Sequence, residues 1–376
     1  MAIGGRAVAR FDGLVVFVAG AAPGDRALVQ VTAAKKNYAE ADLVTVLSPG
    51  PSRIVPPCPY LSPRPSGGPS AARTCGGCSW QHIAYPEQLR QKKMLLQSAL
   101  DKQSGFIGAA VRDVAASPGE FRYRNRIQLH REPGTPTGLP GKIGFRARRS
   151  EDVVDVEDCL IAEEALAREI ATVRAEVAAG RADPPPRFEL RLRTSGTEFG
   201  QVNSAQNAVL VDHVVERFQS LAGANALEFI WDLYAGAGNF TFPLADAFPQ
   251  AQIRAVELDL GAVTAGIGQA RARGDERRIR FDRSAVENWL AGARIEGRTA
   301  ALLDPPRVGC DPSAIAALTK LNLDFLLYVS CHPITLARDL RTFHEAGWRL
   351  QDVAPFDMFP QTDHIESVSC LLPPTP

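Results

Sequence analysis

The sequence predicts an α/β protein whose C-terminal half is a doubly wound, mostly parallel sheet, preceded by smaller β-rich parts. From about residue 205 onward, short apolar runs alternate with stretches of helical periodicity, and each run ends at a glycine turn or a polar residue. Such alternation is typical of a sheet covered by helices on both faces, whose ligands bind at the carboxyl ends of the strands. Before residue 50 the apolar runs are short and closely spaced, which predicts a small β-barrel.

Three parts are therefore expected along the chain, namely 1–52, 53–204 and 205–376. The first has apolar runs at 14–18, 28–31 and 43–47, and the second has arginine-rich strands followed by an Ala- and Glu-rich helix at 162–180. In the third, strands are expected at 227–233, 253–256, 300–303 and 325–329. A helix is also expected at 87–100, after a loop rich in Pro, Gly and Ser at 61–70.

Composition restricts the class of protein only loosely. The chain has 376 residues, 45% of them hydrophobic, and its formal net charge is zero. The most apolar early run, 14–22, is far shorter than the ~20 residues that span a bilayer, and no signal-peptide pattern is present. We therefore expect a cytoplasmic protein without a membrane partner.

A local concentration of positive charge lies in the middle of this neutral chain. Residues 121–150 contain eight Lys or Arg and one acidic residue, Glu132, with Phe121, Tyr123 and Phe145 among them. Basic side chains that contact phosphates and aromatic rings that stack on bases are typical of RNA binding. An ordinary solvated strand face is the alternative.

The first strand of the C-terminal part leads into a glycine turn, Asp232-Leu-Tyr-Ala-Gly-Ala-Gly-Asn239. Glycine permits a tight turn and a close approach of the ligand to the backbone. Glu257 ends the next strand, where a carboxylate can accept both ribose hydroxyls of a nucleoside. The spacing is GxGN rather than GxGxxG, so it favours S-adenosylmethionine over a dinucleotide. A tight turn without a ligand is the alternative.

Two further strand ends carry candidate catalytic groups. Asp304 begins an Asp-Pro-Pro turn, and Arg307 stands where an aromatic residue would favour methylation of an exocyclic amine. Cys331 follows the fourth strand and is a candidate nucleophile, although a buried structural cysteine is the commoner case. A thiolate that adds to C6 of uracil makes C5 nucleophilic, and a base must then remove the C5 proton. Glu366 is the candidate base, and a solvated carboxylate at a strand start is the alternative.

Seven cysteines in a chain of this size do not indicate a disulfide framework. Cys75 and Cys78 form a CxxC turn with two glycines between them, and Cys58 and Cys159 flank it along the chain. Four cysteines support a metal site, and their spacing does not separate zinc from an iron–sulfur cluster. A redox pair is a third possibility, but no thioredoxin-like context surrounds the motif.

The order of these motifs resembles the RNA uracil-5 methyltransferase family, the bacterial rRNA and tRNA (uracil-5-)-methyltransferases. The similar segments are CGGCSWQH, YRNRIQLH, FGQVNSAQN, DLYAGAGNFTFPLA, LLDPPRVG, YVSCHPITLARDL and DMFPQTDHIESV. They extend from about residue 53 to 372, and their joint order is highly specific. The N-terminal segment also resembles a TRAM domain, an OB-type barrel that binds RNA.

This resemblance implies a Rossmann-like class I methyltransferase domain behind a TRAM-like barrel and a central domain with a [4Fe–4S] cluster. It implies that residues 86–119 can pack with the catalytic domain. It also implies a monomeric enzyme without a protein partner. Its implied site residues are Cys331 as nucleophile and Glu366 as base, with Gln201, Tyr234, Asn239, Glu257, Ser284 and Asp304 at the cofactor and Cys58, Cys75, Cys78 and Cys159 at the cluster.

Three departures from the family pattern and two competing functions remain. Sixteen residues, 59–74, separate Cys58 from Cys75, whereas the family often has only a few. His332 replaces the Asn often found after the nucleophile, and Gly200 replaces a family aromatic before Gln201. The TRAM-like segment and the cluster favour 23S rRNA over tRNA as the substrate. A non-catalytic RNA-binding protein and a small-molecule or amine methyltransferase are the other classes of protein considered.

Overall fold

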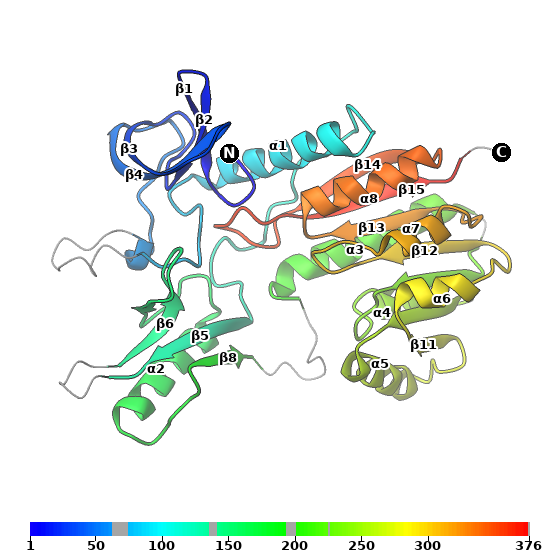
Figure 1. Ribbon diagram of the computed structural model, residues 1–376. Helices are drawn as coiled ribbons and strands as arrows, with labels where there is room; N and C mark the ends of the chain where they lie inside the picture. The colour runs from blue at the N-terminus through cyan, green and yellow to red at the C-terminus, as the bar shows by residue number, and fades with distance from the viewer. Residues whose placement is uncertain (62–73, 135–140, 193–200, 225, 375–376) are drawn as a thin grey trace.

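The computed structural model describes residues 1–61, 74–134, 141–192, 201–224 and 226–374, and it contains three sheets over these ranges (Figure 1). Two small four-stranded sheets lie on one side of the molecule, and a seven-stranded sheet with helices on both faces lies on the other. In the part of the chain that is described, no helix has the length and apolar character needed to cross a membrane.

The N-terminal sheet has the strand order β1-β2-β4-β3, so β1 and β3 are its edges and the four strands are not joined into a closed ring. Three register shifts interrupt the pairing of β3 with β4, and such bulges increase local twist. The small core contains Val16, Val18, Ala39 and Ala41. The predicted strands are present, and they are longer than the apolar runs. Their bounds are β1 Ala7–Phe11, β2 Leu14–Ala19, β3 Arg26–Ala34 and β4 Tyr38–Ser48.

The central sheet is antiparallel throughout, with the order β7-β6-β5-β8, and α2 covers one of its faces. Ile127 and Leu129 of β5 pack there against Leu166 and Ile170 of α2. The helix predicted at 162–180 is thus confirmed, with slightly shorter bounds. The elements are β5 Arg126–Glu132, β6 Lys142–Arg146, β7 Val153–Asp155, α2 Glu164–Ala178 and β8 Arg187–Arg191.

The C-terminal sheet has the order β11-β10-β9-β12-β13-β15-β14. Its first five strands are parallel, and β15 runs antiparallel between β13 and β14. Successive strands extend outward from β9 in one direction and from β12 in the other, so the point between β9 and β12 is where a doubly wound sheet binds its ligands. The strands are β9 Phe229–Leu233, β10 Gln252–Glu257, β11 Ile279–Arg283, β12 Thr299–Leu303, β13 Leu326–Ser330, β14 Arg349–Phe356 and β15 Glu366–Leu372.

Helices cover both faces of this sheet, and they pack against it in two large apolar cores. The helices of this part are α3 Ser204–Ala222, α4 Thr241–Ala247, α5 Leu260–Arg273, α6 Val286–Gly292, α7 Pro312–Leu318 and α8 Pro333–Glu345. The four strands predicted from apolar runs are present. β11 and β14 were not predicted, because charged and polar residues interrupt their apolar ones.

Helix α1, Tyr85–Gln103, belongs by its contacts to the C-terminal sheet although it precedes the central sheet in the chain. It lies beside α8 (Figure 1), and its Leu96 and Leu100 are buried in the same core as Phe343. The segment after it continues the sheet, because Arg112 N donates to Val353 O at 2.9 Å and Ala115 N donates to Pro355 O at 2.8 Å. Helix α1 and the segment that follows it thus contact α8 and β14 of the C-terminal part.

A buried ion pair fixes α1 to the connection between β14 and β15. Lys92 and Asp357 have fully buried side chains, and Lys92 Nζ lies 2.5 Å from Asp357 Oδ1. Gln88 adds two hydrogen bonds to Gln361, whose backbone has a positive φ of 69°. The segment that leads into Glu366 is therefore anchored to α1 at Asp357 and at Gln361.

Candidate active site

The glycine turn after β9 has the shape of a ligand cradle. Tyr234, Gly236 and Gly238 all have positive φ angles, of 64°, 55° and 102°. A Cβ atom on Gly238 would lie 2.5 Å from the ring of Phe242, so this position excludes a side chain. The turn can therefore bring its backbone close to a bound molecule.

Glu257 is held rigidly beside this turn. Its Oε2 accepts a hydrogen bond from Gly236 N at 3.0 Å, and its Oε1 accepts from Leu258 N and Asp259 N at 2.7 and 2.8 Å. Backbone donors thus fix the carboxylate at the end of β10. A fixed acceptor at this point suits the vicinal hydroxyls of a ribose.

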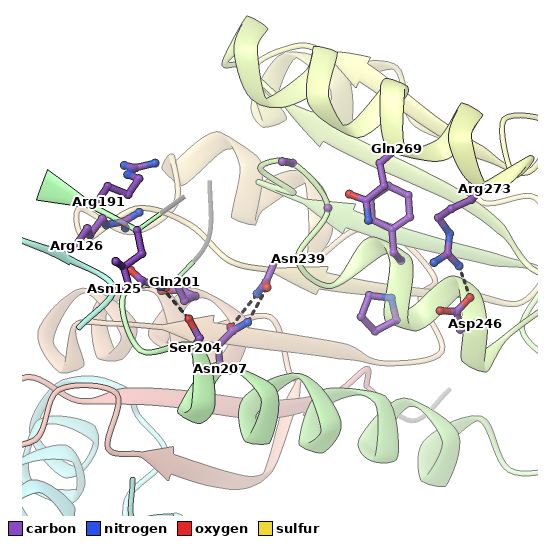
Figure 2. Close-up of a pocket in the computed structure, with 15 residues that line it drawn as sticks. Asn125, Arg126, Arg191, Gln201, Ser204, Asn207, Asn239, Asp246, Gln269 and Arg273 are labelled. Atoms are coloured by element: carbon purple, nitrogen blue, oxygen red, sulfur yellow. Dashed lines mark hydrogen bonds and ion pairs between the residues drawn. The ribbon is translucent and has the colours of Figure 1, made fainter. Parts of the chain in front are cut away.

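The turn opens onto a cavity of about 530 Å³, which Figure 2 shows. Gln201 and Asn239 line it, and the side chains of Asn239 and Asn207 form two hydrogen bonds with each other, of 2.8 and 3.1 Å. Asn125 fixes the neighbouring backbone, because its Nδ2 donates to Gln201 O at 2.8 Å. Two of the six predicted cofactor residues thus line this cavity.

The other four predicted cofactor residues lie at adjoining strand ends. Asp304 N donates to Leu233 O at 3.1 Å, which places Asp304 beside the turn, and Tyr234 is the residue after Leu233. Ser284 N donates to Glu257 O at 3.0 Å, but its side chain lines a separate cavity of about 650 Å³ beside β11. The structure therefore groups Tyr234, Glu257 and Asp304 closely and leaves Ser284 at the margin.

Buried carboxyl groups gather at this edge of the sheet. Burial raises the pKa of Asp232 to about 6, and burial together with the charges of Asp232 and Glu257 raises the pKa of Asp304 to about 7. The pKa of Glu366 is raised well above its usual value, by burial and then by Asp304. The buried Asp232 Oδ1 has no hydrogen-bond partner among the described residues. A cationic ligand would stabilise such a cluster.

Cys331 and Glu366 are brought together by strand register. Ser330 of β13 pairs with Ser367 of β15, so Cys331 and Glu366 are the next residues on these two antiparallel strands. Glu366 is only 4% exposed, which rules out the solvated carboxylate considered from sequence. The cysteine is half-buried at the same edge as Asp304.

The Cys331 thiol is protonated in this environment. Burial, and then the charges of Glu366 and Asp304, raise its pKa to about 12, whereas Arg307 lowers it. His332 is the N-cap of α8, and its ring accepts a hydrogen bond from Thr335 N at 3.5 Å. The substitution of His for the more usual Asn thus retains a cap beside the thiol, and additional positive charge is needed to form the thiolate.

The four predicted metal ligands line one cavity of about 120 Å³ between the CxxC turn and the central sheet. Burial raises the pKa of Cys75 and Cys78 to about 12 and also raises the pKa values of Cys58 and Cys159. Among the described residues, no three Cys, His, Asp or Glu side chains lie close enough to hold a single metal ion. The four cysteines thus line one cavity in the described part of the chain, without forming such a group.

Comparison with known proteins now decides the family. Residues 187–372 match the profile of the tRNA (uracil-5-)-methyltransferases, and residues 3–44 match the TRAM domain. The 23S rRNA (uracil(1939)-C(5))-methyltransferase RlmD of Dichelobacter nodosus is 30% identical, and the alignment covers 97% of this chain and 95% of that protein. The chain belongs to the S-adenosylmethionine-dependent RNA (uracil-5-)-methyltransferases.

Two further similarities agree with this assignment. An uncharacterized RNA methyltransferase of Bdellovibrio bacteriovorus is 37% identical to this methyltransferase, over 98% of this chain and 92% of the other. The crystal structure of a Pyrococcus abyssi tRNA (uracil-54, C5)-methyltransferase in complex with S-adenosyl-L-homocysteine superimposes with a TM-score of 0.71. That alignment covers 98% of this chain and 100% of the other at 21% identity, so it supports the fold.

Two further side chains at the glycine turn of this methyltransferase were not among the predicted site residues. Asp232 is fully buried, and its Oδ2 accepts a hydrogen bond from Thr241 Oγ1 at 2.5 Å. Asn207 orients Asn239 from the first turn of α3. The position of Asp232 inside an otherwise apolar strand could have identified it from the sequence as a site residue. The contact of Asn207 with Asn239 is visible only in the folded structure.

Proposed function

We propose that this methyltransferase methylates C5 of a uridine in 23S rRNA through a covalent bond between Cys331 Sγ and C6. The observation that carries the proposal is the register of β13 and β15, which brings a thiol and a buried carboxyl together beside Asp304. The reaction requires two different groups. The Cys331 thiolate can add to C6 of the uracil ring, and the Glu366 carboxylate can take the proton from C5.

The residues at the cofactor turn fit S-adenosylmethionine. Asp232, Glu257 and Asp304 offer carboxylates near a glycine turn with no basic residue, which suits a cationic nucleoside without phosphates. When it is bound, S-adenosylmethionine supplies an electrophilic methyl group and a positive charge that lowers the pKa of neighbouring acids. We assign Gln201, Tyr234, Asn239, Glu257 and Asp304 to its binding, with Ser284 at the edge of the site.

Addition to C6 and removal of the C5 proton each have a candidate residue in this site. Cys331 gives its proton to solvent, the resulting thiolate adds to C6, and the C5=C6 π electrons move to form an enolate. C5 takes the methyl group while the bond from sulfur to that methyl breaks. Glu366 removes the C5 proton, the C6–Sγ bond breaks and the C5=C6 double bond forms again. The raised pKa of Glu366 makes it a stronger base than an exposed glutamate.

The choice of 23S rRNA rests on the relatives and on the TRAM domain. Two relatives at 29% and 30% identity are named as 23S rRNA (uracil(1939)-C(5))-methyltransferases, and the alignments cover 98% and 97% of this chain. We expect the purified protein to transfer labelled methyl groups to unmodified 23S rRNA and much less to unmodified tRNA. Digestion to nucleosides should place the label in 5-methyluridine. Preferential labelling of tRNA would contradict the choice of rRNA, and label elsewhere would contradict C5 chemistry.

We propose that Cys58, Cys75, Cys78 and Cys159 hold a [4Fe–4S] cluster. All four side chains line one buried cavity, and four thiolates are the ligand set of such a cluster. The cavity joins the CxxC turn to β5, since Gln128 and Arg124 also line it. A cluster there would hold the basic strands of residues 121–150 in place for RNA.

Removal of one ligand tests this assignment. Anaerobically purified protein should be brown with about four irons per chain, and Cys75→Ala should lose both iron and RNA affinity. Affinity for S-adenosylmethionine should survive, because the glycine turn lies in another part of the fold. Colourless protein with stoichiometric zinc would overturn the cluster. Normal RNA methylation by iron-free Cys75→Ala would overturn its structural role.

A further inference from the structure

Asp363 lies in the connection between β14 and β15, three residues before Glu366, and its carboxylate joins this connection to two distant parts of the chain. Its Oδ2 accepts a hydrogen bond from Gly4 N at 2.8 Å, and its Oδ1 accepts one from Ser79 Oγ at 3.0 Å. Ser79 Oγ also accepts a hydrogen bond from Asp363 N at 3.1 Å. Ser79 directly follows Cys78. The N-terminal segment and the CxxC turn therefore both contact the segment that carries the proposed base.

The N-terminal segment packs closely around the Asp363 carboxylate. Gly5 has a positive φ of 77°, and a Cβ atom there would lie 2.7 Å from Ser79 Cβ and 3.0 Å from Asp363 Oδ1. The fully buried Trp80 fixes the same region, because its Nε1 donates to Gly5 O at 3.1 Å and its backbone N donates to Gln361 O at 2.9 Å. The absence of a side chain at Gly5 thus allows the backbone to approach the carboxylate.

The carboxyl group of Glu366 is not held by a hydrogen bond of its own. None of the described residues donates a hydrogen bond to it, although the side chain is 4% exposed. Its backbone pairs with Phe356 of β14, whereas pairing with β13 begins at Ser367. The position of the carboxyl group relative to Cys331 therefore depends on how residues 363–365 lead into β15.

We propose that Asp363 is a positioning residue, which holds the backbone before Glu366 so that the Glu366 carboxylate can reach the C5 proton. The inference rests on the proposed function, because it takes Glu366 to be the base. A general base acts only within hydrogen-bond distance of the proton that it removes. Cys331 follows β13, and the hydrogen bonds of Asp363 go to other segments. Breakdown of the covalent adduct should therefore depend on Asp363, whereas its formation should not.

Asp363→Ala tests this role. A misplacement of about 1 Å can slow a step by roughly 10²-fold, and because the pairing with Phe356 remains, we expect breakdown of the adduct to slow by about 10-fold. The adduct should form at the wild-type rate, and affinity for S-adenosylmethionine should be unchanged. Chemical quenching of single-turnover reactions, followed by denaturing gels, measures both rates. Asp363→Asn retains an acceptor for Gly4 N and should restore most of the wild-type rate of breakdown.

Ser79→Ala and Gly5→Ala alter the same contact from the other side. Loss of the Ser79 hydroxyl, or a Cβ atom at Gly5, should slow adduct breakdown as Asp363→Ala does. The double variant Ser79→Ala/Asp363→Ala should be no slower than Asp363→Ala, because both changes remove one shared contact. Gly13→Ala is the matched control. Gly13 also has a positive φ, of 80°, but a Cβ atom there would have no neighbour within 4 Å.

Two results would overturn the inference. One is a wild-type rate of adduct breakdown in Asp363→Ala, and the other is equal slowing of adduct formation and breakdown, which would indicate a general loss of structure. If Asp363→Ala does not fold, Ser79→Ala decides by the same two criteria, because it removes only one oxygen atom. Glu366→Gln separates this inference from the proposed function. Normal turnover by Glu366→Gln would overturn the proposed base, whereas slow breakdown by Glu366→Gln with normal breakdown by Asp363→Ala would overturn only the positioning role.

Discussion

Cys331→Ser is expected to lower the rate of RNA methylation on the order of 10³-fold or more, as removal of a covalent nucleophile does in other enzymes. A hydroxyl is a far weaker nucleophile than a thiolate toward C6. The side chains are similar in size, and the position is half-buried at a strand end, so the fold should be retained. Affinity for S-adenosylmethionine, measured by calorimetry, should change little.

The covalent bond itself can be trapped with RNA that contains 5-fluorouridine. After methyl transfer C5 carries fluorine in place of the proton that Glu366 would remove, so the Cys331–C6 bond cannot be eliminated. Wild-type protein should give a stable protein–RNA adduct on a denaturing gel, and Cys331→Ser should give none. Cys370→Ser is the matched control, because Cys370 is buried in β15 and contacts Gln351 instead of the site. Equal adduct yields from wild type and Cys331→Ser would rule out this nucleophile.

The raised pKa of Cys331 means that adduct formation should depend on the presence of S-adenosylmethionine. With a pKa of about 12, the thiol is almost fully protonated at neutral pH in the free protein. Positive charge near Asp304 and Glu366 would lower that value. The rate at which wild-type protein forms the adduct should therefore depend strongly on S-adenosylmethionine, and reaction of free protein with a thiol reagent should be slow at Cys331.

The sequence predicted those parts of the fold whose strands are continuous apolar runs. β9, β12 and β13 are buried along most or all of their length, and their residues are almost all apolar. β11 is an edge strand of the named sheet, and the first four residues of β14 are exposed or only partly buried, so both strands tolerate arginines and aspartates. Periodicity alone does not separate such strands from polar loops.

The chemistry of the site depended on contacts that the sequence does not contain. Cys331 and Glu366 are 35 positions apart, and only the insertion of β15 between β13 and β14 makes them neighbours. The same holds for Asp232 and Asp304, which meet because the strand order places β9 beside β12. Motif order gave the candidate residues, whereas strand order explains why their carboxyl groups perturb one another.

The resemblance predicted that residues 86–119 pack with the catalytic part, but the ion pair that fixes them there was visible only in the structure. Lys92 of α1 is a fully buried cation whose partner, Asp357, lies far away in the sequence. A lysine in a helical stretch is usually interpreted as a solvated residue. Here it fixes the segment before Glu366, so the position of the proposed base depends on a helix that precedes the central sheet.

Glu366→Gln is expected to stop the reaction after methyl transfer. Glutamine has nearly the same shape as glutamate but cannot accept the C5 proton, so elimination of Cys331 should slow by about 10²- to 10⁴-fold, the usual contribution of a general base. Addition to C6 and methyl transfer do not require this base. A protein–RNA adduct that already carries the new methyl group should therefore accumulate with ordinary uridine RNA, and mass spectrometry of the digested adduct would detect it. Glu345→Gln on α8, an exposed glutamate paired with Arg341, is the control and should turn over normally.

The pH dependence gives a second test of the same residue. A base acts only in its deprotonated form, and burial together with Asp304 raises the pKa of Glu366 well above that of an ordinary glutamate. In wild-type protein the rate of adduct breakdown should therefore fall as the pH is lowered through that raised pKa, at a higher pH than an exposed glutamate would give. The Glu366→Gln variant should lack this dependence and break down its adduct slowly at every pH. Full turnover by Glu366→Gln, with the wild-type pH profile, would show that a different group removes the C5 proton, and Asp304, whose pKa is about 7, would then be the carboxyl to test.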